Sequence, residues 1–122
     1  MTLIYIGLFA ILGAWARYGQ TIAVQDIFGR SFPIATLSIN VIGSFLMAFL
    51  FTITLEKLNV SGPVRTGMLT GGVGGYTTFS TFSLETYALI QAGHLVKGAT
   101  YIILSLLLGL LAVILGVWLA HR

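Results

Sequence analysis

The 122-residue sequence contains no cysteine, two prolines and few charged residues. Without cysteine, the chain has no disulfide framework and no thiolate metal site. Charged residues make up 7% of the chain, whereas a soluble globular domain has about 25%. The net charge of +3 comes with no basic cluster, so nothing indicates nucleic-acid binding. These deficits argue against a soluble domain, a disulfide-rich secreted domain and a nucleic-acid-binding protein.

Apolar residues dominate instead, at 57% of the chain. The length is sufficient for four membrane spans of roughly 20 residues each and for little else. We therefore predict one domain, residues 1–122, with an all-α membrane fold of four transmembrane helices. The first apolar segment is too long for a signal peptide and lacks a cleavage pattern, so we expect it to remain as a span. The predicted helices cover residues 3–24, 32–55, 64–92 and 95–121.

Basic residues near the ends of the predicted spans are almost evenly divided between the two sides of the membrane. One side carries Lys57, Arg65 and Arg122, and the other carries Arg30 and Lys97. The positive-inside rule therefore gives little orientation signal. Two topologies remain open: one weakly biased orientation, or insertion in both orientations with antiparallel pairing.

The third predicted helix contains the run Gly-Gly-Val-Gly-Gly-Tyr-Thr-Thr-Phe-Ser-Thr-Phe at residues 71–82. Glycine is a poor helix former, so we expect this run to unwind at membrane depth. Unwinding frees backbone carbonyls and amides, which must then be satisfied by protein, water or an ion. The run is therefore a candidate ion site inside a broken helix.

Three polar residues lie in or near the apolar segments, and each has two interpretations. Asn40, near the middle of the second helix, either makes an interhelical hydrogen bond or presents an uncharged donor to a pore. Arg17 either extends to the interface or places a positive charge at the mouth of an aqueous vestibule. Glu85 either pairs with a cation or lines the other mouth. The sequence does not decide among these.

Phe79 and Phe82 share a helix face directly after the glycine run. They are either packing residues or rings whose positive edges line an anion path, with hydroxyl donors from Ser80 and Thr81 beside it. A four-helix unit has little room for an internal pore, so a transport path is expected at or near a subunit interface. No catalytic constellation or phosphate-binding loop is present, and we expect no enzyme activity.

Three motifs resemble those of the small bacterial fluoride channels, the Fluc or CrcB family. They are residues 74–82, the pattern Gly13 to Tyr18, and Asn40-Val41-Ile42-Gly43. The resemblance implies an antiparallel, dual-topology homodimer in the bacterial inner membrane, surrounded by lipid. It also implies passive fluoride efflux through two pores, each built from both chains.

The resemblance assigns roles to individual residues. The residues that it places along the fluoride path are Asn40, Phe79, Phe82, Ser80, Thr81 and Tyr101. It places Arg17 near a vestibule. The backbone carbonyls of Gly74 and Thr77, from both chains, are expected to hold a central structural Na⁺.

Two other functions compete with this one. A small proton-coupled multidrug transporter needs an intramembrane carboxylate, but the first helix has no acid and Glu85 comes late in the third. A membrane scaffold without transport activity explains faces of small residues. It does not explain a glycine break beside paired aromatic rings.

Overall fold

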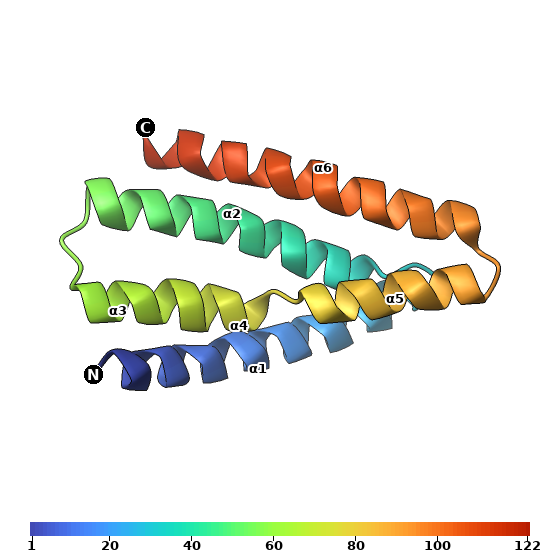
Figure 1. Ribbon diagram of the computed structural model, residues 1–122, viewed down its shortest axis with the longest axis horizontal. Coiled ribbons are helices and arrows are strands. Elements are labelled where there is room, and N and C mark those ends of the chain that lie inside the picture. The colour runs from blue at the N-terminus through green and yellow to red at the C-terminus, as the bar shows by residue number, and fades with distance from the viewer.

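The computed structural model describes residues 1–122 and contains helices but no strands. The segments are α1 (Thr2–Phe28), α2 (Ile34–Glu56), α3 (Gly62–Thr66), η1 (Gly67–Val73), α4 (Gly74–Tyr76), α5 (Phe79–Gln91) and α6 (Leu95–Ala120). Figure 1 shows α1, α2 and α6 as long helices. Between α2 and α6 in the chain, the segments α3 to α5 follow one another as a single interrupted helix, which is the third span. Both termini lie at the same end of the bundle (Figure 1). The predicted all-α fold with a broken third helix is confirmed.

The outer surface of the bundle is apolar. Three helices, α1, α2 and α6, are long and apolar enough to cross a membrane. Gly13 is the one buried residue of α1, and few residues of α6 are buried inside the protein. Because lipid solvates such faces and water does not, the chain is a multi-pass membrane protein.

Two predicted helix ends were wrong by a few residues. The first helix continues beyond residue 24 to Phe28, because Gln25 and Asp26 do not interrupt it. It ends at Gly29, whose φ of +77° is a conformation that favours glycine and whose N–H donates to the Gln25 carbonyl. The second helix begins at Ile34, not at residue 32, since Pro33 is its N-cap.

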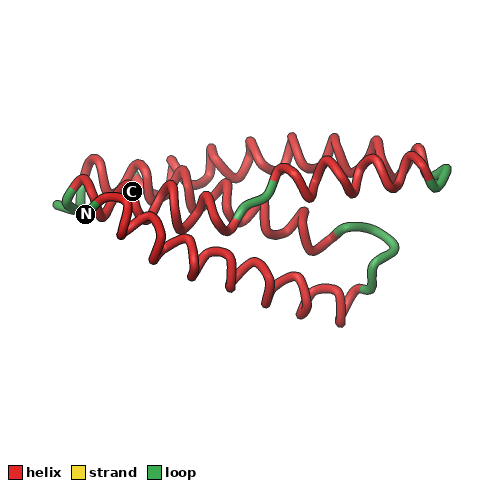
Figure 2. The backbone as a smooth tube through the Cα atoms, turned by 60° about the horizontal axis from the view of Figure 1, so that its bottom comes forward, coloured by secondary structure: helices red, strands yellow, loops and turns green.

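The core of the bundle lies between α2 and α6. Ile39 on α2 and Tyr101 on α6 are the largest fully buried side chains. Gly116 lets the two helices approach, because a Cβ there would lie 2.7 Å from the Phe45 carbonyl oxygen. On the other side, α1 packs against η1 and α4. This arrangement places the interruption of the third span near the middle of the bundle, where Figure 2 shows it as a short loop between helices.

Candidate functional site

The helix break lies at two threonines. Thr77 and Thr78 have extended backbones, with φ and ψ of −79° and 160° for Thr77 and of −150° and 114° for Thr78. The prediction that the glycines unwind is wrong: Gly71 and Gly72 belong to the π-helical segment η1, and Gly74 and Gly75 belong to α4. The break is therefore two residues long and follows the glycine run.

The glycines serve close packing against α1. A Cβ at Gly71 would collide with the Ile6 carbonyl oxygen, and one at Gly75 would lie 3.1 Å from the Ala10 carbonyl oxygen. From the opposite side, a Cβ at Gly13 would collide with the carbonyl oxygen of Gly72. These contacts leave no room for side chains. The glycine motif therefore sets the distance between two helices, while the unwinding occurs at residues with side chains.

Asn40 holds the break from α2. Its Nδ2 donates to the Thr78 carbonyl, and its Oδ1 accepts from the Thr78 N–H, both at 2.9 Å. In a continuing helix that N–H would donate to the Gly74 carbonyl. Gly43, one turn further along α2, leaves room for the break. A Cβ at that position would collide with the methyl group of Thr77. The interhelical interpretation of Asn40 is thus observed, and its second N–H remains free of any protein partner.

The break leaves backbone oxygens without protein donors. The carbonyl of Thr77 accepts no hydrogen bond, and the carbonyl of Gly74 loses the Thr78 donor to Asn40. Gly74 is also exposed on the surface of the single chain. These are the two residues whose carbonyls were predicted to bind a cation. Hard carbonyl oxygens at membrane depth are suitable ligands for a hard cation such as Na⁺.

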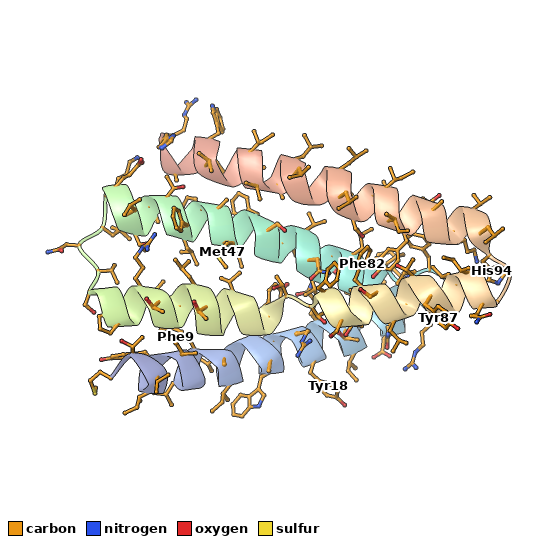
Figure 3. The ribbon with its side chains drawn as sticks, in the orientation of Figure 1. Phe9, Tyr18, Met47, Phe82, Tyr87 and His94 are labelled. Atoms are coloured by element: carbon orange, nitrogen blue, oxygen red, sulfur yellow. The ribbon has the colours of Figure 1, made fainter.

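Aromatic rings follow the break and continue onto α6. The ring centroids of Phe79 and Phe82 lie 5.8 Å apart, and those of Phe82 and Tyr101 lie 5.0 Å apart in an edge-to-face arrangement. Phe82 extends into the space between α5 and the helices beyond it (Figure 3). Phe79, in contrast, is 78% exposed. The predicted aromatic pair is therefore assembled, with one ring inside the bundle and the other on its surface.

Tyr101 has no exposed surface. Its hydroxyl donates to Oε1 of Glu85 at 2.8 Å, which connects α6 with α5. It does not line any of the larger cavities. A pore-lining role for Tyr101 stays a prediction, and in the single chain Tyr101 adjoins cavities through neighbours such as Glu85 and Phe32.

Thr78 lines two cavities, each of which also contains polar side chains. One, of about 320 Å³, is lined by Asn40, Thr78 and Phe79 among others. The other, of about 310 Å³, is lined by Thr78 together with Arg17 and Glu85. Glu85 was expected either to pair with a cation or to line the mouth opposite Arg17, and in the structure the two residues border the same cavity. Thr78 therefore lines both the cavity that contains the Asn40 amide and the cavity that contains Arg17 and Glu85.

The hydroxyl groups that follow the break make hydrogen bonds at the N-terminus of α5. Thr78 caps this helix, with its Oγ1 accepting from the Thr81 N–H at 3.2 Å and hydrogen bonded to the Thr81 Oγ1 at 3.0 Å. Thr81 lines the cavity that contains Arg17 and Glu85. Ser80 is exposed, and its Oγ is 3.5 Å from the Thr78 Oγ1. Both predicted hydroxyl residues thus lie in the first turn of α5 after the break, Thr81 lining a cavity and Ser80 on the exposed surface.

One residue of the site was not singled out from the sequence. Thr78 is the residue that Asn40 clamps, and its place directly after Thr77 in the glycine-threonine run was the available signal. Ser105 on α6 has a buried Oγ with no hydrogen-bond partner, but it lines neither of the cavities at Thr78.

Comparison with known proteins gives consistent matches over nearly the whole chain. The family model described as CrcB-like protein, camphor resistance (CrcB), matches residues 4–117. A protein of Acidithiobacillus ferrooxidans, named fluoride-specific ion channel FluC, is 62% identical over 117 residues, which cover 96% of this chain and 94% of that protein. Proteins of the same name from Methylococcus capsulatus and Geotalea daltonii are 44% and 40% identical. They cover 100% and 95% of this chain, and the aligned regions span 54% and 94% of their own lengths.

Proposed function

The chain belongs to the CrcB-like family, and we propose that it is a fluoride-selective ion channel through which fluoride leaves the cell passively. Its named relatives are channels and not enzymes. The observation that carries the proposal is the clamped break at Thr77 and Thr78, followed directly by the aromatic pair Phe79 and Phe82. A cavity lies on either side of this break.

Fluoride is a small anion that accepts hydrogen bonds strongly, so a path for it must replace water with donors. Asn40 has one N–H that the protein does not use, and Ser80 and Thr81 add hydroxyls. The positive edges of the rings of Phe79 and Phe82 provide weak contacts that an anion can leave again. Uncharged donors and ring edges suit permeation better than a fixed cation, which would hold the ion. Arg17 would instead concentrate anions in the adjoining vestibule, with Glu85 as the second charge there.

We place the complete path in an antiparallel, dual-topology homodimer in the bacterial inner membrane. Phe79 is 78% exposed and Gly74 is also exposed, so part of the predicted path faces outward from the single chain. A second copy would cover these residues and complete the pore. The near balance of basic residues between the two ends of the bundle permits insertion in both orientations.

Na⁺ is proposed as a structural cation held by carbonyls of Gly74 and Thr77 from both chains. The support is that the Thr77 carbonyl has no protein donor and the Gly74 carbonyl has lost its helical one. When bound, the cation would neutralise the partial charges of converging carbonyls. The protein groups define the site by holding the break open: Asn40 does this from α2, and the glycines do it by fixing α4 against α1.

Reconstitution in liposomes tests the channel function. Purified protein is placed in vesicles loaded with potassium fluoride, valinomycin is added to carry potassium, and released fluoride is measured with an electrode. We expect fast fluoride release that needs no proton gradient, and little release from vesicles loaded with chloride. Comparable fluoride and chloride fluxes would contradict selectivity. Dependence on a proton gradient would favour a coupled transporter, and the absence of any flux would favour a scaffold.

Cation exchange tests the Na⁺ proposal separately. Protein is purified in Na⁺ or in a bulky organic cation, and its oligomeric state and thermal unfolding are compared in both. We expect the dimer to be less stable in the organic cation. Equal stability in the two buffers would mean that the broken helix does not hold Na⁺.

A further inference from the structure

Tyr76, the last residue before the helix break, begins a chain of hydrogen bonds through three helices. Its hydroxyl donates to Oε1 of Gln20 on α1. Gln20 in turn donates through Nε2 to the Ser38 hydroxyl on α2, at 3.0 Å. Ser38 donates to the Ala35 carbonyl at 2.8 Å. We propose that this relay, Tyr76–Gln20–Ser38, is a positioning network that holds the helix break in the geometry needed for fluoride permeation.

The relay and the Asn40 clamp hold opposite ends of the same two-residue break. Tyr76 precedes Thr77 and is attached to α1 through Gln20, while Thr78 is attached to α2 through Asn40. The Thr77 N–H still donates to the Val73 carbonyl, but Thr78 has no helical hydrogen bond, so side chains must define the path of the chain there. With both ends fixed, the carbonyls and rings around the break keep one position.

Ser38 and Asn40 place hydrogen-bonding side chains on two different faces of α2. They are two residues apart, which places them about 200° apart around the helix. One face of α2 is therefore bonded to α1 through Ser38, and another to the break through Asn40. The relay ties together the three elements whose relative positions determine where the break lies.

The hydroxyl of Tyr76 has a role separate from that of its ring. Tyr76 is 8% exposed, and its ring packs near Gly43, where a Cβ would lie 3.3 Å from the Tyr76 Cδ2. Phenylalanine would keep that packing and remove only the hydrogen bond to Gln20. The Gln20 oxygen would then be left without its donor in an apolar region, and the glutamine would reorient.

The inference rests on the proposed channel function, and the test separates the two. We compare Tyr76→Phe, Gln20→Met and the double variant in the liposome fluoride assay, with flux expressed per folded dimer. Each single variant should lower flux by about three- to tenfold, the range that corresponds to one net hydrogen bond. The double variant should lose about as much flux as the more affected single variant, because both substitutions interrupt the same relay and their effects are not additive.

Tyr87→Phe is the matched control. The Tyr87 hydroxyl also pairs with a glutamine, Gln91, but it is 58% exposed and far from the break along α5 (Figure 3). This variant should conduct like wild type. A second measurement does not depend on flux: hydrogen exchange of the Thr77–Thr78 amides should be faster in Tyr76→Phe than in Tyr87→Phe.

Each outcome decides the inference. Normal flux and exchange in both single variants would overturn it, and so would single losses that simply multiply in the double variant, because independent effects do not indicate one network. If Tyr76→Phe does not fold, the flux and the amide exchange of Gln20→Met decide. If wild-type protein carries no fluoride, the channel proposal fails, and amide exchange alone decides whether the relay holds the break.

Discussion

Replacement of Asn40 by leucine should disable the channel by releasing the helix break. Leucine keeps the number and branching of the side-chain heavy atoms, with somewhat more bulk, but cannot form hydrogen bonds to backbone groups. The variant loses both 2.9 Å hydrogen bonds to Thr78. The N–H and the carbonyl of Thr78 are then unsatisfied in a residue that is 8% exposed.

The expected magnitude follows from these two groups. A buried polar group that loses its partner costs about 1–3 kcal/mol, so two cost about 2–6 kcal/mol. The cavity of about 320 Å³ beside Asn40 can admit water, which places the expected loss near the lower end, at about 2–3 kcal/mol. Since about 1.4 kcal/mol corresponds to a tenfold change in an equilibrium constant, the ratio of correctly held to released breaks should fall about 30- to 150-fold.

Fluoride release from liposomes and thermal unfolding without fluoride give the two readouts. We expect at least a tenfold loss of flux (about 1.4 kcal/mol) and a lower unfolding temperature. Asn59→Leu, the same change in the exposed loop between α2 and α3, should leave both unchanged. If Asn40 acted only as a pore donor, flux would fall while stability stayed normal. Normal flux and stability together would refute the clamp.

Three further predictions concern the path, the glycines and the topology. Phe79→Ile and Phe82→Ile should each reduce fluoride flux at least tenfold (about 1.4 kcal/mol) in a folded dimer, because isoleucine has bulk but no positive ring edge; normal flux in both would make the rings packing residues. Gly71→Ala should destabilise the protein by about 2 kcal/mol, since its Cβ meets the Ile6 carbonyl, whereas a Cβ at Gly7 meets nothing within 4 Å and Gly7→Ala should change the free energy of unfolding by no more than about 0.5 kcal/mol; equal destabilisation by the two variants would show that Gly71 is not there for close packing. Single cysteines placed in the loops of this cysteine-free chain should react with an impermeant reagent from both sides of the membrane, and labelling from one side only would rule out dual topology.

Much of the fold was predictable because the chain offers few alternatives. Four apolar segments in 122 residues, separated by short loops with Gly29, Pro33 and Pro63, allow little except a four-helix membrane bundle. The aromatic pair and the polar residues could also be chosen from the sequence, since polar groups inside apolar helices are costly unless they have a purpose. The short glycine-threonine motif carried the family resemblance that the comparisons then confirmed.

The location of the break depended on contacts that the sequence does not display. Propensity placed the unwinding at the glycines, but propensity is a weak local preference. The backbone of α1 packs so closely on Gly71 and Gly75 that these residues remain helical. The backbone opens instead at Thr78, because Asn40, 38 residues earlier in the chain, replaces its helical partner.

The sequence by itself determined the membrane class, the four apolar segments and the set of polar and aromatic residues available for a path. These properties depend on composition and spacing along the chain. Tertiary structure alone decided which groups meet: Asn40 with Thr78, Tyr76 with Gln20, and Arg17 with Glu85 around one cavity. The physical reason is that a helix fixes its own backbone bonds locally, whereas a break in the helix must take its partners from distant segments.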